Sequence, residues 1–259
     1  MSAAVLAGRA LDAARRRQPP FALNYHGVGE RVSADPHGLV VGLDVFERHL
    51  AGLRAQGRRL VGMTDLWRRV RAGGDAAQGQ GAVTIDDGLS RTLEGVLPVL
   101  ERHGATATAY IPTGLIGGPH PHLPEARIAD RAQLLEVAAA GVEIGAHSVT
   151  HPRLSELPYP QALDEVRRSR ADLEDLLGRA VTSMAYPFGR YTAETQRAAE
   201  AAGYECACAD VGSGPWRRFA LPREGILPST SPLRLRLKVM GLYEPALRLA
   251  QARNALRAR

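Results

Sequence analysis

The sequence predicts an α/β protein built on a parallel sheet, and it favours a closed barrel over an open sheet. Short apolar runs alternate with amphipathic stretches along most of the 259 residues, an order typical of parallel sheets. A glycine follows each of five helix-like stretches closely, where a left-handed cap residue is favoured, and a strand-like run begins soon after. The length suits one α/β barrel or two average domains, and periodicity alone does not exclude the open sheet.

The expected elements follow from two periodicities. The helix-like segments carry apolar residues at three- and four-residue spacings, as at Phe46, Leu50 and Leu53. We expect strands near 21–25, 59–62, 82–86, 106–111, 142–146, 181–186, 204–208 and 219–222. We expect helices near 44–56, 64–72, 91–103, 130–140, 159–177 and 192–202. The glycines expected to end helices are Gly57, Gly104, Gly141, Gly178 and Gly203.

Three regions differ in character. Residues 21–228 carry the strand and helix alternation, residues 1–20 form a basic, helical extension, and residues 229–259 form a basic amphipathic segment. Ser231 and Pro232 are typical of an N-cap followed by proline in the first helical position. This last segment either packs against the barrel with a solvated outer face or lies on an anionic membrane surface, which would require an exposed apolar face.

The composition is that of an ordinary globular protein, with 45% hydrophobic and 23% charged residues. The net charge of +6 suits nucleic acid, anionic membranes or phosphorylated substrates, or reflects compositional bias. No helix-turn-helix, zinc-finger or RNA-recognition signature is present, so we expect no nucleic-acid partner. Cys206 and Cys208 are expected to be core thiols. The N-terminus lacks a signal-peptide pattern, which predicts a cytoplasmic protein.

Two adjacent aspartates, Asp86 and Asp87 in "VTIDDGLS", end a predicted strand. In parallel α/β sheets, sites are built at the carboxyl ends of strands. Paired carboxylates resist double ionisation unless a cation lies beside them, which a bound metal would provide. The alternative is that Asp87 and Gly88 form a turn and Asp86 caps the next helix.

Two histidines four residues apart, His147 and His151 in "AHSVTH", follow another predicted strand. Neutral imidazoles at this spacing can bind one divalent ion, from a helical turn or from a curled loop. A lone histidine would more often be a core or capping residue. Two of them at the end of a neighbouring strand make a metal site the favoured interpretation.

Two further stretches follow strands. In "AYPFGRY", Pro187 and Gly189 predict a tight turn that either is an ordinary loop or directs the Phe188 backbone N–H toward an oxyanion, with Tyr186 and Tyr191 shaping the pocket. His26 in "LNYHGV" closes the first predicted strand.

Together, "TIDDG" and "HSVTH" resemble the motifs of the polysaccharide deacetylase family, the NodB homology domain of carbohydrate esterase family 4. The resemblance spans roughly residues 21–226. It implies a distorted (β/α) barrel of about seven parallel strands, similar to a TIM barrel, with residues 21–228 as the catalytic domain. It also implies that Asp86 is the general base and that Asp87, His147 and His151 bind the metal.

The chain departs from the family pattern in two places. Ala185 stands where the family's third motif usually has an arginine that orients the catalytic aspartate, and a branch of the family shares this feature. The late histidine that serves as general acid is also absent, because no histidine follows His151. In a closed barrel the last strand lies beside the first, so we predict that His26 takes this role, as in a branch with an early Tyr-His motif.

The implied reaction is metal-dependent removal of an N-acetyl group from an acetamido sugar on a glycan, a lipid or a nucleotide carrier, with release of acetate. Two histidines and a carboxylate suit Zn²⁺ best, although Co²⁺, Ni²⁺, Mn²⁺ and Fe²⁺ fit the same ligands. A cytoplasmic enzyme, with possible peripheral contact at the inner membrane face, is the expectation. The alternatives are a metal-dependent hydrolase of non-sugar amides and an inactive glycan-binding homologue.

Overall fold

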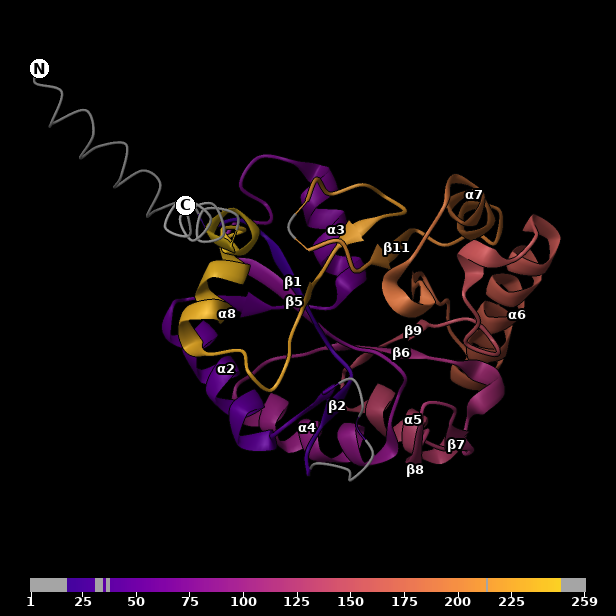
Figure 1. The fold of residues 1–259 in the computed structure, drawn as a ribbon, viewed down its shortest axis with the longest axis horizontal. Helices are drawn as coiled ribbons and strands as arrows, with labels where there is room; N and C mark the ends of the chain where they lie inside the picture. Colours follow the sequence, from indigo (N-terminus) through magenta and orange to yellow (C-terminus); the bar gives the residue numbers. More distant parts are fainter. Residues whose placement is uncertain (1–17, 31–34, 36–37, 213, 248–259) are drawn as a thin grey trace, which may run out of the picture.

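The computed structural model describes residues 18–30, 35, 38–212 and 214–247, so the predicted extension at 1–20 lies almost entirely outside the described residues. A nearly closed barrel of parallel strands, surrounded by helices, forms the molecule (Figure 1). Its eight strands are, in barrel order, β12 (Leu221–Pro222), β11 (Cys206–Ala209), β10 (Ser183–Ala185), β9 (Glu143–Ala146), β6 (Thr108–Ile111), β5 (Gln80–Ile85), β1 (Phe21–Tyr25) and β13 (Glu224–Gly225). The predicted α/β barrel is confirmed.

A single extended segment closes the barrel. Within it, β12 pairs with β11 on one side and β13 pairs with β1 on the other, and both pairings are parallel. Only Arg223 separates these two short strands, so they occupy one place in the barrel. The eight strands therefore occupy seven positions around the barrel, in agreement with the family resemblance, which implied about seven strands.

The helices lie outside the barrel. Six of the helices that the structure describes lie within one residue of their expected bounds: α2 (Leu43–Ala55), α3 (Met63–Ala72), α4 (Ser90–Arg102), α5 (Arg131–Ala139), α6 (Tyr159–Leu177) and α7 (Ala193–Ala201). A further helix, α8 (Pro232–Val239), lies in the segment 229–259, for which no helix bounds were predicted. The five glycines expected to end helices all have positive φ angles, between 56° and 86°. The caps stop each helix where the next strand has to begin.

Alternation along the strands divides the core into two layers. Phe21, Leu23 and Tyr25 of β1 face the helices, and Ala22, between the first two, faces the barrel interior. The interior layer also contains both cysteines, which are free and fully buried. Burial raises the pKa of the Cys208 thiol to about 12, so the prediction of core thiols is confirmed.

Two pairs of short strands were not predicted. A parallel pair, β2 (Gly27–Val28) and β3 (Val40–Val41), and an antiparallel hairpin, β7 (Pro119–His120) and β8 (Leu123–Arg127), lie beside the barrel. The strand expected near 59–62 is present as β4 (Arg59–Leu60), which extends the sheet next to β5. No helix or strand was predicted at the hairpin. β2, β3 and β7 have two residues each, too few to show a period.

Helix α8 begins as expected from its sequence. The Ser231 hydroxyl accepts a hydrogen bond from the Arg234 N–H at 3.3 Å, and Pro232 is the first helical residue. Leu235 and Val239 are buried, so one face of the helix packs on the protein. Within the described part of the chain, no helix combines the length and the hydropathy needed to span a membrane.

Candidate functional site

The two aspartates leave β5 at a sharp bend. Asp86 directly follows the strand, and Asp87 has a left-handed backbone with φ of 67°, followed by Gly88 with φ of 62°. A Cβ on Gly88 would lie 2.5 Å from the Ile111 Cδ1 atom, and the left-handed φ adds to the preference for glycine. Helix α4 starts instead from Leu89, so the alternative that Asp86 caps this helix is wrong. The bend lets consecutive carboxylates enter one site.

A second strained loop follows β9 and carries the two histidines. Ser148 and His151 have φ angles of 64° and 59°, and the His151 N–H donates to the Ser148 hydroxyl at 3.1 Å. The Glu165 carboxylate of α6 fixes the same loop by accepting hydrogen bonds from two backbone N–H groups, at 2.8 and 2.9 Å. The rings of His147 and His151 consequently lie 4.9 Å apart. Strained left-handed residues held this firmly are typical of functional sites.

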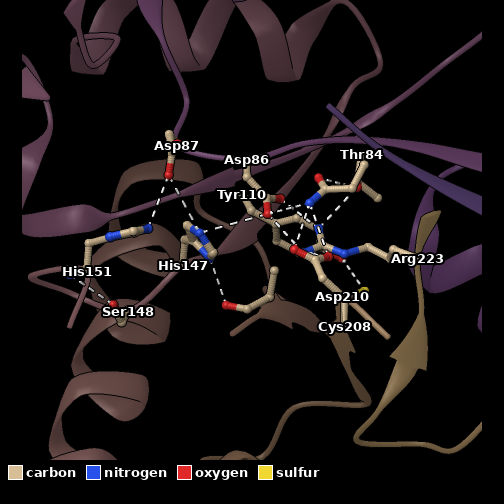
Figure 2. A network of polar contacts seen from close by, with 12 residues as sticks. Thr84, Asp86, Asp87, Tyr110, His147, Ser148, His151, Cys208, Asp210 and Arg223 are labelled. Carbon is tan, nitrogen blue, oxygen red and sulfur yellow. Dashed lines mark hydrogen bonds and ion pairs between the residues drawn. The ribbon is translucent and has the colours of Figure 1, made fainter. Parts of the chain in front are cut away.

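The Asp87 carboxylate and the two imidazoles converge on one point (Figure 2). Asp87 Oδ1 lies 3.2 Å from His151 Nε2 and 3.7 Å from His147 Nε2, and donor atoms of all three residues lie within 4.8 Å of one another. The His147 Nδ1 donates to the Ala185 carbonyl at 2.8 Å, which leaves the Nε2 lone pair free. Asp87 Oδ1 is buried without a hydrogen-bond partner among the described residues. A divalent cation fits this donor set.

Burial and charge keep His147 and Asp87 in the form that a cation requires. Burial, which the neighbouring carboxylates only partly offset, lowers the pKa of His147 to about 4, so its ring is neutral near pH 7. Burial raises the pKa of Asp87, but contacts with His120 and His151 outweigh it and hold the pKa well below its usual range. At neutral pH the site therefore offers an anionic carboxylate and a neutral imidazole.

Asp86 makes a bidentate ion pair with Arg223. The Nη1 and Nη2 atoms of Arg223 lie 2.7 and 2.9 Å from the two carboxylate oxygens, and the arginine side chain is fully buried (Figure 2). Burial raises the pKa of Asp86, but Arg223, with His147 and His26, outweighs this effect and lowers it. Asp86 is thus ionised, oriented and 4.0 Å from His147 Nε2, next to the cation site.

The remaining predicted residues line a cavity of about 600 Å³ at the carboxyl ends of the strands. His26 follows β1 and lies half-buried in the wall, close enough to lower the pKa of both aspartates. Phe188 has a φ of 60°, and its ring packs 4.9 Å from that of His151. The lining residues are His26, Leu39, Asp87, His120, His122, His151, Arg153, Phe188, Arg190 and Asp210.

The two tyrosines do not shape this cavity, contrary to expectation. Tyr186 is fully buried, and its hydroxyl donates to the Phe219 carbonyl at 3.1 Å. Its ring stacks on Tyr191 with centroids 5.8 Å apart. Both therefore support the loop at Phe188 from behind.

The sequence model of the polysaccharide deacetylase family matches residues 74–207, just over half of the chain. The chain belongs to the polysaccharide deacetylase family. Among curated relatives, YxkH, a polysaccharide deacetylase homologue of Bacillus subtilis (strain 168), is 33% identical over 48% of this chain and 42% of its own length. The bifunctional xylanase/xylan deacetylase of Cellvibrio japonicus is 25% identical over 55% of this chain and 20% of its own length. The matched region thus spans less than half of either relative.

Solved structures of deacetylases share the fold. The deacetylase PplD of Streptococcus pyogenes, solved with acetate, has a TM-score of 0.75 and 23% identity over 86% of this chain and 99% of that one. IcaB of Ammonifex degensii has a TM-score of 0.74 and 20% identity over 86% of this chain and 97% of that one. These likenesses confirm the deacetylase barrel.

Arg223 bears on the first departure from the family pattern. Ala185 has no side chain that could orient Asp86, whereas Arg223 of the closing segment binds both oxygens of that carboxylate. Asn24 supports the pair by donating from Nδ2 to Asp86 at 3.2 Å and to Asp210 at 3.1 Å. Arg223 lies outside the matched region 74–207, as does His26.

Sequence reasoning missed Arg223, Asp210 and His120. A signal existed for the first two, since each directly follows a strand-like run, in "LPREG" and "CACAD". The closed-barrel argument that brought His26 beside the last strand applies equally to Arg223. No pattern indicated His120, because it comes from the two-residue strand β7.

Proposed function

We propose that this member of the polysaccharide deacetylase family hydrolyses the N-acetyl group of an acetamido sugar in a metal-dependent reaction. One observation carries the proposal: an ionised, arginine-bound Asp86 lies directly beside the group formed by Asp87, His147 and His151. A pure binding site has no need of an oriented base next to a cation site. The arrangement therefore favours catalysis over glycan binding alone.

A divalent cation bound by Asp87, His147 and His151, with Zn²⁺ the preferred candidate, would polarise the acetyl carbonyl and increase the acidity of water. Asp86 accepts the proton as the water oxygen bonds to the carbonyl carbon. In this proposal the Phe188 N–H donates to the oxyanion. His26 delivers a proton to the sugar nitrogen as the C–N bond breaks, which gives acetate and a free amine.

The first test measures acetate release from N-acetyl sugars on lipid, nucleotide and oligosaccharide carriers and from non-sugar amides, with and without chelator. We expect release from at least one sugar, loss with chelator and recovery with Zn²⁺. Turnover of non-sugar amides alone would contradict the sugar assignment. Absence of turnover with every substrate in the metal-loaded protein would contradict the catalytic one.

The roles of the base and the acid are tested separately. We expect Asp86→Asn and His26→Ala each to lower kcat by about 10²- to 10⁴-fold while bound metal, counted by elemental analysis, stays at the wild-type level. His103→Ala, at the end of α4 beside Glu47 and absent from the cavity lining, is the control and should keep full activity. Full activity of His26→Ala would remove His26 from the mechanism.

We further propose that the segment from Ser231 contacts an anionic membrane surface at the inner face. Leu233 and Leu242 are 67% and 50% exposed, and Arg234 and Arg236 are exposed beside Leu233. Exposed leucines among arginines are typical of interfacial segments. A cytoplasmic location and a lipid-linked substrate would agree with this proposal.

Vesicle sedimentation tests the membrane proposal. Deleting residues 229–259 is unsuitable, because Leu235 and Val239 of this segment are buried in the protein. We expect the wild type to sediment with vesicles rich in phosphatidylglycerol and not with phosphatidylcholine. Leu233→Asp combined with Leu242→Asp should abolish sedimentation and leave the folding transition unchanged. Equal behaviour of wild type and variant would exclude this surface.

A further inference from the structure

The two oxygens of the Asp87 carboxylate have different partners. Oδ1 faces His151 and His147 at 3.2 and 3.7 Å. Oδ2 lies 3.2 Å from the Nε2 atom of His120, a residue that is 4% exposed and comes from the β7–β8 hairpin beside the barrel. One oxygen is thus directed at the cation site, and the other is directed away from it, toward His120.

The hydrogen bond at the far side of the ring determines which His120 nitrogen carries the hydrogen. The backbone N–H of His122 lies 3.2 Å from His120 Nδ1 and donates to it. An accepting Nδ1 uses its lone pair, so the neutral ring carries its hydrogen on Nε2. His120 therefore presents an N–H donor to Asp87.

His120 is unsuited to binding the cation directly. An Nε2 that carries hydrogen has no lone pair to offer a metal. His120 is also absent from the group of donors that lie within 4.8 Å of one another. Its Nε2 is buried without a fully aligned hydrogen-bond partner among the described residues, and the Asp87 oxygen is within reach. A small rotation of either side chain completes this bond.

We infer that His120 is a positioning residue that holds Asp87 Oδ2 by an Nε2–H hydrogen bond, so that Oδ1 remains directed at the cation. The inference rests on the proposed metal site. Without the donor, the carboxylate is free to rotate about its Cβ–Cγ bond and to present either oxygen or both. Partners of this kind around metal ligands typically change metal affinity by about 10- to 100-fold.

The test uses the full-length chain, stripped of metal and titrated with Co²⁺, whose visible absorption reports ligand number and geometry. Three variants are compared with the wild type. His120→Phe keeps a ring and removes the donor, His120→Gln places an amide N–H near the position of Nε2, and His103→Phe makes the same change away from the site. Circular dichroism and thermal unfolding of the metal-free proteins verify that each variant folds.

We expect His120→Phe to bind Co²⁺ about 10- to 100-fold more weakly with an altered absorption band. His120→Gln should recover most of the Co²⁺ affinity and of the wild-type absorption band. His103→Phe should match the wild type. Unchanged affinity and spectrum in His120→Phe would overturn the inference. Complete loss of binding in both His120 variants would identify His120 as a direct ligand and also overturn it. Failure of the wild type to bind Co²⁺ would instead overturn the metal site itself.

Discussion

At the scale of single residues, Arg223 decides how Asp86 ionises. Its side chain is fully buried between Asp86 and Asp210, with ion-pair distances of 2.7 and 2.9 Å. Both carboxylates raise the pKa of the guanidinium well above its usual range, although burial alone would lower it. Removal of this cation leaves Asp86 buried without its charge partner, which favours the protonated acid.

Replacing Arg223 with Met tests this role. The substitution should raise the pKa of Asp86, so the acid limb of the kcat profile, where the base loses activity by protonation, should move to higher pH. Stability should fall by about 3–5 kcal/mol, as for other broken buried pairs. The control is Arg168→Met, which loses an exposed pair with Asp164 on α6, away from the site. An acid limb at the wild-type pH in the folded variant would contradict the assignment.

His49 makes a pH-dependent connection at the same scale. Its Nδ1 accepts from the Tyr25 hydroxyl at 2.9 Å, and its Nε2 donates to the Thr230 carbonyl at 3.1 Å. Burial lowers the pKa of His49, against a smaller raising effect of Thr230. The neutral ring thus links β1, α2 and the segment that leads into α8.

The pKa shift of His49 predicts how stability changes with pH. Because the folded pKa is lower than the unfolded pKa of about 6.5, the unfolded chain binds the proton more readily. The contribution of His49 to the free energy of unfolding is complete above pH 6.5. It is lost as the pH falls below that value toward the folded pKa. We expect the difference in urea midpoint between wild type and His49→Gln to shrink between pH 7.5 and 5. A difference independent of pH would contradict a titrating His49.

At the scale of elements, residues with a left-handed backbone shape the loops that follow the strands and carry the site. Gly189 follows Phe188 with φ of 65°, and a side chain on it would meet the Asp210 Cβ atom at 2.3 Å and the Asp210 backbone nitrogen at 2.8 Å. Gly104, at the end of α4, has φ of 56° with nothing within 4 Å. The two glycines share the backbone conformation and differ in the space around them.

Substitutions at Gly104 and Gly189 distinguish the cost of a left-handed backbone from the cost of a steric clash. Gly104→Ala should cost only the left-handed penalty, about 1–2 kcal/mol in urea denaturation. Gly189→Ala should cost more than that and should also lower kcat, because the clash moves the strand end that carries Asp210. Equal losses of stability in the two variants would show that the Phe188 loop has room to move.

Sequence patterns located the elements more reliably than the contacts between them. Helix bounds agree within one residue because the 3.6-residue period is measured over several turns and the glycine caps add independent signals. The Asp and His motifs are local, so they revealed the cation site. The Arg223–Asp86 pair joins residues 137 positions apart, and no local period encodes such a contact. The β7–β8 hairpin, with its His120, was missed because the two residues of β7 are too few to show a period.

At the scale of the whole molecule, the two ends of the barrel have different tasks. At the amino-terminal end, Glu143 accepts hydrogen bonds from the Thr108 and Ser183 hydroxyls at 2.9 and 2.8 Å, which satisfies polar groups inside the barrel. The carboxyl-terminal end holds the cavity, the carboxylates and the histidines. Such a division is typical of barrels, where one rim provides stability and the other carries the chemistry.

The closing segment has a consequence for the order in which the protein is made. Every proposed cation ligand has been synthesised once His151 leaves the ribosome, whereas Arg223 follows much later in the chain. A proteolysed chain that ends before residue 223 would contain the ligands and Asp86 without the guanidinium that pairs with both oxygens of that carboxylate. Closing the barrel and orienting Asp86 are therefore one event in folding, because the same segment carries β12, Arg223 and β13.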